Sequence, residues 1–377
     1  MPKLRALQSL RAIAALLVVL DHAAGLTAGH GFSREPINSW ATFLGAQGVS
    51  IFFIISGFIM TYTADSAEDP TAPRLRATRF AARRIIRVVP LYWLLTAVVA
   101  VPMFLLGLHR PVGITVARLA KSLFFIPYTD AGGNMTPVLP IGWTLNYEMA
   151  FYAVFAAILL LPHRVRTAVL LGTLVSVVIA GSFFYPIASG INPRSPLEFL
   201  TNPVILLFGL GAALGWLKLK FPQWLLAVQD VPLVAPLLAI NLCVFALAVH
   251  HPPVALRWLV LFWFVDFIVV ALCVFGRPGS WPRLEALGDA SYSLYLIHLL
   301  PVFLIYFLWQ SLHFLYPVAF IVTAIGLSIA AGLMTYRWIE RPLTRSLSRL
   351  AFPLPATKKV VGELAEIPVS SHPNLLP

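Results

Sequence analysis

The chain has 377 residues, of which 59% are hydrophobic and only 11% are charged, and its mean hydropathy is +0.85. This composition excludes an ordinary soluble domain and predicts an all-α, polytopic integral membrane protein. Lys and Arg outnumber Asp and Glu by 27 to 15, and in a membrane protein such an excess indicates topology rather than a nucleic-acid partner. Cys243 and Cys273 lie within apolar runs and lack metal-binding spacing, so we expect no metal site.

Ten apolar runs predict ten transmembrane helices, since each approaches the ~20 residues that a spanning helix needs. They cover residues 8–28, 43–63, 88–107, 143–161, 167–188, 202–217, 231–249, 256–275, 290–311 and 317–338. With the N-terminus placed in the cytoplasm, 21 of the 27 Lys and Arg fall on the cytoplasmic side and 6 fall outside. The positive-inside rule therefore predicts an N-in, C-in, multi-pass protein of a bacterial cytoplasmic (inner) membrane.

The first run carries two ionisable side chains on one face of the predicted helix. Arg11 and His22 are eleven residues apart, within about 20° of three full turns, and lie about 16 Å apart along the axis. His22 therefore falls near the midplane of a bilayer about 30 Å thick, where an ionisable group indicates a functional interior. A cleaved signal peptide is the alternative, which Asp21 and His22 within the apolar core disfavour. Asp21 points about 100° away from His22 and is assigned no role.

The second run contains small residues at Gly48, Ser56 and Gly57. Small side chains allow another helix or a ligand to approach the backbone closely. Helix packing alone would explain this pattern. Ser56 is kept as a candidate for substrate binding or support.

A cluster of arginines stands at the cytoplasmic entrance of the third run. Arg84 and Arg87 are three residues apart and share a helical face. Guanidinium groups bind phosphate in bidentate fashion, so this pair suits a phosphorylated co-substrate, with Arg11 as a third candidate. The alternative is topological charge that contacts lipid phosphates.

The fourth run begins at Trp143 and carries Glu148 about 9 Å below the outer interface. His22 lies about 14 Å below the same interface, so these two side chains can meet. A carboxylate beside an imidazole stabilises the imidazolium that forms on proton uptake. We therefore predict that His22 is a general base and that Glu148 orients it. A structural carboxylate at a backbone break is the alternative for Glu148.

The ninth run carries Ser291, Tyr295 and His298 on one face of its helix. For His298 a packing role with a hydrogen-bonded partner is favoured over catalysis. The predicted residues of substrate binding or support are Trp143, Ser56, Tyr295 and His298. Asp266 in the eighth run falls near the midplane and has no evident partner.

Taken together, these stretches resemble the acyltransferase-3 family of integral-membrane O-acyltransferases. The matching features are the Arg11-to-His22 spacing, Gly48 to Gly57, Arg84-Ile-Ile-Arg87 before Pro90, Trp143-Thr-Leu-Asn-Tyr-Glu148, Ser291 to His298, and Ile339-Glu340-Arg341-Pro342. Within the family the chain looks most similar to the exopolysaccharide-modifying branch of rhizobial type. That likeness rests on residues 7–11 and 52–60.

The resemblance implies an O-acetyltransferase that uses acetyl-CoA, or another acyl-coenzyme A, as a co-substrate. The implied acceptor is a sugar hydroxyl of a secreted or envelope polysaccharide or of its lipid-linked precursor, and membrane lipid is a further partner. Residues 1–345 would form the membrane-embedded domain, and residues 346–377 a cytoplasmic tail without periodicity, predicted to be disordered. A secondary transporter or glycan flippase is the alternative from another class, because buried His, Glu and Asp suit it equally. A polysaccharide polymerase would need an outer loop longer than the one around residues 108–142.

Overall fold

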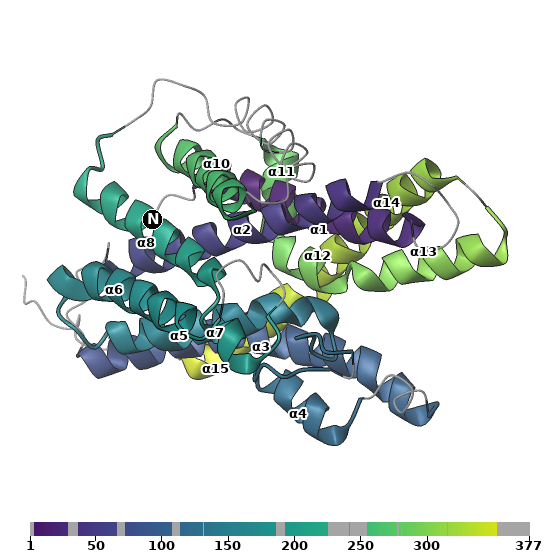
Figure 1. The fold of residues 1–377 in the computed structure, drawn as a ribbon, viewed down its shortest axis with the longest axis horizontal. Helices are drawn as coiled ribbons and strands as arrows, with labels where there is room; N and C mark the ends of the chain where they lie inside the picture. The colour runs from purple at the N-terminus through teal and green to yellow at the C-terminus, as the bar shows by residue number, and fades with distance from the viewer. Residues whose placement is uncertain are drawn as a thin grey trace, which may run out of the picture.

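The structure is a computed structural model that describes the greater part of the chain. The described residues are 4–28, 37–65, 72–107, 114–130, 132–185, 193–224, 241, 255–276, 279, 281–314 and 316–352. Within these residues the chain forms helices and no strand, which confirms the all-α prediction (Figure 1). The predicted run at 231–249 lies outside the described residues, apart from Asn241.

The longer helices follow the predicted apolar runs, and short helices and turns join them. The longer ones are α1 (Arg5–Ala28), α2 (Ile37–Asp65), α3 (Pro73–Leu105), α5 (Trp143–Ile158), α6 (His163–Ser182), α8 (Leu206–Lys220), α10 (Ala255–Phe275), α13 (Leu299–Ser311) and α14 (Pro317–Thr335). The shorter ones are α4 (Val116–Leu123), α7 (Pro196–Leu200), α11 (Pro282–Asp289), α12 (Ser291–Ile297) and α15 (Arg341–Ala351). Pro140–Gly142 and Pro203–Ile205 form 3₁₀ turns, and Tyr336–Glu340 (η5) forms a π-helical turn between α14 and α15.

Six helical stretches in the described part of the chain are long and apolar enough to cross a membrane, and the bent pair α12–α13 is a seventh candidate. The structure therefore fits a multi-pass membrane protein without confirming ten spans. Helix α5 has 16 residues and ends earlier than predicted, because a turn at residues 159–161 leads into Pro162, which precedes α6. Helix α10 has 21 residues, which by length is enough for a span. The N-in, C-in orientation stays a prediction.

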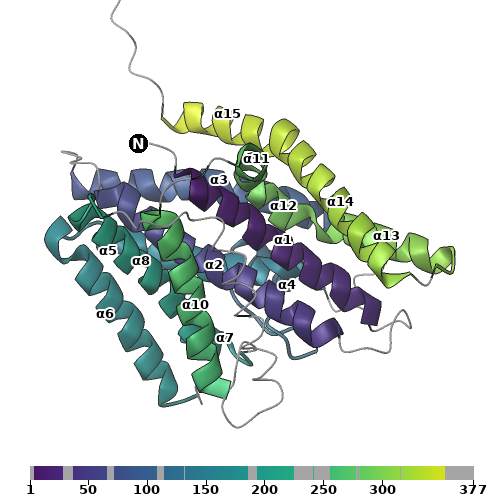
Figure 2. The same cartoon turned by 90° about the horizontal axis from the view of Figure 1, so that it is seen from above.

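Helix α1 lies at the centre of the fold. It runs beside α2 through the middle of the molecule, with α6 at one edge and α13 and α14 toward the other (Figure 2). It also contacts α10, α11, α12, α13 and α14. Residues of α1 therefore face several different helices along its length, and Arg11 and His22 have different surroundings for this reason.

Glycines bring the central helices into backbone contact. A Cβ atom on Gly57 of α2 would lie 2.0 Å from the carbonyl oxygen of Phe208 in α8, and one on Gly211 of α8 would lie 1.9 Å from that of Ile54. A Cβ on Gly48 would lie 2.4 Å from the carbonyl oxygen of Ala14 in α1. The packing interpretation of the Gly48-to-Gly57 stretch therefore holds, since only glycine allows these helices to approach so closely.

A helix break at His298 separates α12 from α13, whose axes differ by 42°. Pro301 explains the break, because it has no N–H to donate to the carbonyl oxygen of Ile297 and its ring crowds the preceding turn. The Ser328 hydroxyl of α14 lies 3.5 Å from the carbonyl oxygen of His298 and donates to it. The same oxygen also accepts a hydrogen bond from the backbone N–H of Val302 at 3.1 Å.

The predicted tail is helical at its start. Helix α15 continues to Ala351, so residues 346–351 are not the disordered segment that the sequence suggested. Arg345 and Arg349 recur four residues apart, with Leu347 and Leu350 between and after them, and this spacing forms an amphipathic helix. Residues 353–377 lie outside the described residues.

Candidate functional site

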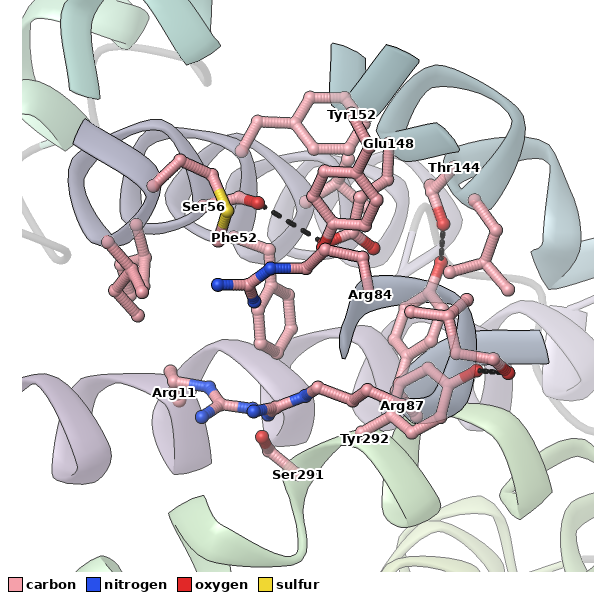
Figure 3. A pocket seen from close by; sticks show the side chains of 18 residues that line it. Arg11, Phe52, Ser56, Arg84, Arg87, Thr144, Glu148, Tyr152, Ser291 and Tyr292 are labelled. Carbon is pink, nitrogen blue, oxygen red and sulfur yellow. Dashed lines mark hydrogen bonds between the residues drawn. The ribbon is translucent and has the colours of Figure 1, made fainter. Parts of the chain in front are cut away.

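A cavity opens between α1, α2, α3, α5 and α12 (Figure 3). Six of the predicted site residues line it: Arg11, Ser56, Arg84, Arg87, Glu148 and Tyr295. The sequence therefore identified all four charged side chains that line this cavity, which we call the arginine pocket. The convergence of the six residues from five helices is a finding of the structure.

Three guanidinium groups gather in the arginine pocket. Arg11 and Arg87 extend from α1 and α3 into the same space, and Arg84 points into it from one turn earlier on α3 (Figure 3). Arg11 donates to the side-chain oxygen of Gln8 at 3.2 Å, and the buried Nε of Arg84 has no hydrogen-bond partner. The guanidinium of Arg84 lies over the rings of Phe80 and Tyr152, at 5.5 and 5.6 Å from their centres. Like charges so close together repel one another unless an anion lies between them.

Glu148 has hydroxyl partners in this pocket. Its Oε1 accepts a hydrogen bond from the Ser56 hydroxyl at 3.2 Å and another from the Tyr152 hydroxyl. Tyr152 is four residues further along α5, so it shares the face of Glu148. The sequence analysis missed Tyr152, although this spacing was sufficient to find it. Through Tyr152, Glu148 supports the ring on which Arg84 stacks.

Ser291, Thr144 and Tyr295 complete the polar lining. The buried Oγ of Ser291 has no hydrogen-bond partner and lies beside Arg11 and Arg87 in the pocket (Figure 3). The Tyr295 hydroxyl lies 2.7 Å from the hydroxyl of Thr144 and donates to the carbonyl oxygen of Ile141 at 3.2 Å. An orphaned buried hydroxyl next to clustered guanidinium groups is suited to a polar ligand that brings its own acceptors.

His22 lies away from this lining and contacts His298. The rings of His22 and His298 are 5.0 Å apart at an angle of 62°, and His298 Nε2 is 3.4 Å from His22 Nδ1. His22 Nδ1 also lies 2.9 Å from the carbonyl oxygen of Val18, and His298 Nδ1 lies 2.7 Å from that of Tyr295. We call these two residues the histidine pair.

The predicted contact between His22 and Glu148 is not formed. The depth expected for each residue along its helix carries no information on which neighbour that helix faces. His22 faces the α12–α13 break, whereas Glu148 faces Ser56 of α2 and Tyr152. The ring that His22 contacts in the structure is therefore that of His298 and not the carboxylate of Glu148.

The other singled-out residues lie outside the pocket lining. Trp143 packs against Tyr147, with ring centres 6.1 Å apart. Asp266 does have partners, because its buried Oδ1 accepts hydrogen bonds from the side-chain amides of Gln47 at 3.3 Å and Asn241 at 3.2 Å. In the part of the chain that the structure describes, no group of three or more His, Cys, Asp or Glu could hold a metal ion.

Comparisons with known proteins give a consistent result. The model of a family described as "Acyltransferase domain", acyltransferase-3, matches residues 4–337. The exopolysaccharide production protein ExoZ of Rhizobium meliloti (strain 1021) is 36% identical over 336 residues, covering 87% of this chain and 95% of that protein. The nodulation protein 10 of Rhizobium leguminosarum bv. viciae is 28% identical over 342 residues, covering 82% and 85%.

A third relative is matched over only part of its own length. The putative peptidoglycan O-acetyltransferase YrhL of Bacillus subtilis (strain 168) is 27% identical over 377 residues, covering 92% of this chain and 56% of that protein. No solved structure matches the chain significantly. These relatives confirm the family resemblance and its rhizobial branch, which the motifs alone had suggested.

Proposed function

This chain belongs to the acyltransferase-3 family, and on that premise we propose that it is a membrane O-acetyltransferase acting on a polysaccharide. The acyl donor is acetyl-coenzyme A, and the acceptor is a sugar hydroxyl of an exopolysaccharide or of its lipid-linked precursor. The names of the relatives, an exopolysaccharide production protein and a putative peptidoglycan O-acetyltransferase, support a glycan acceptor. The family assignment disfavours the transporter and flippase alternative, because those proteins carry out no acyl transfer.

The observation that carries the proposal is the arginine pocket. Arg11, Arg84 and Arg87 line one cavity, and the hydrogen bonds of Glu148 come from hydroxyls rather than from these guanidinium groups. Glu148 is the one carboxylate in the lining, so the three arginines leave an excess of positive charge, which is costly inside a membrane protein unless a ligand neutralises it. Coenzyme A carries a 3′-phosphate and a diphosphate, and arginine is the side chain that best matches phosphate geometry. The unpartnered hydroxyl of Ser291 offers one further donor.

The two substrates approach from opposite sides. Acetyl-coenzyme A is a cytoplasmic metabolite, and the proposed N-in topology puts the arginine-rich start of α3 on the cytoplasmic side. Its phosphates bind at the arginine pocket, while its flexible arm extends along α1 toward His22, about 16 Å further along the helix axis. The glycan reaches His22 from the outer side. Transfer then takes place near the midplane of the inner membrane.

His22 acts as the general base in this proposal. The sugar hydroxyl oxygen attacks the thioester carbonyl carbon, the carbon–sulfur bond breaks, and coenzyme A leaves as its thiolate. His22 takes the hydroxyl proton and then gives it to the thiolate, so that an ester and a free thiol are formed. Imidazole suits both steps, because its unperturbed pKa near 6.5 allows it to accept and release a proton at neutral pH.

Glu148 belongs to donor binding in this scheme. Its carboxylate holds the Tyr152 hydroxyl, and the Tyr152 ring lies under the guanidinium of Arg84. Ser56 is the second hydroxyl that fixes Glu148. Tyr295 forms the wall between the arginine pocket and His298, since its ring lines the pocket and its carbonyl oxygen contacts the histidine.

Purified protein in lipid nanodiscs tests the proposal. It is given acetyl-coenzyme A labelled in the acetyl group together with a lipid-linked or secreted glycan, and mass spectrometry follows both the glycan and the free thiol. We expect glycan-dependent release of coenzyme A and a gain of one acetyl mass on the glycan. An intact thioester in the presence of glycans from the host's own envelope would contradict the proposed activity, provided that the protein is folded and inserted.

A further inference from the structure

The break between α12 and α13 points the ring of His298 toward α1. His298 is the residue at which the two helices bend by 42°, and its side chain is fully buried. Pro301 causes the bend, and the packing of Ala23 of α1 against Val302 and Ile305 of α13 holds the bent helix against α1. The bend of the backbone and its packing against α1 therefore place the His298 ring next to His22.

Two backbone carbonyl groups determine where the ring protons are. A carbonyl oxygen only accepts hydrogen bonds, so the nitrogen that contacts it must carry the hydrogen. His22 Nδ1 lies 2.9 Å from the Val18 carbonyl oxygen, and His298 Nδ1 lies 2.7 Å from the Tyr295 carbonyl oxygen. Both neutral rings therefore have Nδ1–H and an unprotonated Nε2. It follows that His298 Nε2 is an acceptor, and the nitrogen it faces at 3.4 Å is the Nδ1–H of His22.

We propose that His298 is the positioning residue of His22. This inference rests on the proposed function and deepens it. The Nδ1–H of His22 is shared between the Val18 carbonyl oxygen and His298 Nε2, which leaves His22 Nε2 as the nitrogen that takes the sugar proton. In serine hydrolases a carboxylate holds the corresponding Nδ1–H of the catalytic histidine. Here a neutral imidazole does so, with its own tautomer fixed by the Tyr295 carbonyl.

The neutral acceptor on His298 also affects the protonated form of His22. When His22 takes up the proton, its Nδ1–H becomes a stronger donor, and His298 Nε2 is already placed to accept from it. Tyr295 joins this arrangement to the arginine pocket, because its hydroxyl is held by Thr144 at 2.7 Å while its carbonyl holds His298. His298 therefore acts through His22 and touches neither substrate.

Two substitutions of similar size separate a positioning role from packing. His298→Gln keeps an acceptor oxygen near the position of Nε2, whereas His298→Leu fills the space without an acceptor. We expect His298→Leu to lower kcat at least about tenfold with the donor KM within about twofold of wild type, and His298→Gln to recover most of that loss. Equal effects of Leu and Gln, or parallel changes in kcat and donor KM, would overturn the proposal.

Nitrogen NMR on protein labelled with ¹⁵N-histidine tests the tautomers directly, without any activity. The chain has nine histidines, and the His22→Gln and His298→Gln variants identify the two sets of signals by their disappearance. We expect both rings to be protonated at Nδ1 and bare at Nε2, and an Nε2–H on His298 would refute the inference.

The two proposals fail in different ways. An inactive wild-type protein with the expected tautomers would refute the acetyltransferase proposal and leave the histidine geometry in place. A fully active His298→Leu variant beside an inactive His22→Gln variant would refute only the role of His298.

Discussion

Arg11 and His22, which both lie on α1, have opposite surroundings. Arg11 lies in an open cavity among two further arginines, next to a serine hydroxyl without a partner. His22 lies against one buried imidazole, and its Nδ1 is held by a backbone carbonyl of its own helix. Three clustered cations with one lining carboxylate, next to an orphaned donor, favour the binding of an anionic ligand. A ring held by backbone is already in place before the ligand arrives. One helix thus combines a binding region and a chemical region.

Removing the imidazole of His22 should have the largest effect on activity. His22→Gln should reduce transfer at least ~10²-fold, the typical contribution of a general base. The measurement is kcat at saturating acetyl-coenzyme A, at matched protein insertion. His163→Gln is the control, because this histidine is exposed at the start of α6. If His22→Gln keeps substantial transfer, the chemical region lies elsewhere.

Removing the arginines should affect the other region. Arg84→Ala or Arg87→Ala should raise the donor KM about tenfold or more, since one charge-assisted phosphate contact is worth on the order of 1.5–3 kcal/mol. Lysine at either position should restore donor binding only in part, because it keeps the positive charge but cannot bind a phosphate through two parallel N–H groups. Arg83→Ala is the matched control, since this exposed neighbour lies over Phe352 instead. An unchanged donor KM in the Arg84→Ala/Arg87→Ala double variant would reduce the pair to topology signals.

Glu148→Gln decides to which region the carboxylate belongs. Glu148 is bonded to Ser56 and Tyr152, so the loss of its charge should loosen the support of Arg84 and raise the donor KM several-fold. At saturating donor, kcat should stay within about twofold of wild type. A large loss of kcat at saturating donor would instead show that Glu148 works with His22.

A substitution far from both regions sets the baseline. Oδ1 of Asp130 accepts hydrogen bonds from the backbone N–H groups of Gly132 and Asn134, and Oδ2 accepts one from the Thr136 hydroxyl. Burial alone would raise the pKa of Asp130, but these hydrogen bonds outweigh it and hold the pKa below its usual value. The stabilisation is therefore complete above the ordinary pKa of about 3.9 and is lost as the pH falls through the lower folded value.

Asp130→Asn should accordingly lower the thermal unfolding temperature slightly at pH 7, by less than about 5 °C, and the difference from wild type should shrink below about pH 4. Both kcat and donor KM should stay unchanged at neutral pH. A shift that persists undiminished at pH 3 would show that the carboxylate charge is not its cause.

Helix periodicity predicted which residues share one face of a helix better than it predicted which helices lie against that face. Arg84 and Arg87 do share the pocket that their spacing of three indicated, and Glu148 does enter the same interior. The predicted pairing of Glu148 with His22 is not seen in the structure. Depth along the membrane normal is only one of three coordinates, so two residues expected at similar depth can face different helices. The partner of His22 depended on a kink at Pro301, whose direction no local pattern reveals. Likewise, the amides that hold Asp266 come from residues 47 and 241, far from it in the chain.

The separation of binding from chemistry along α1 is tested most directly by equilibrium binding of coenzyme A itself, which involves no turnover. Calorimetry on inserted wild-type, His22→Gln and Arg87→Ala proteins gives the three dissociation constants side by side. We predict that His22→Gln binds within about twofold of wild type, and that Arg87→Ala binds about tenfold or more weakly. A His22→Gln protein that loses coenzyme A binding, or an Arg87→Ala protein that retains it in full, would contradict the assignment of the two regions.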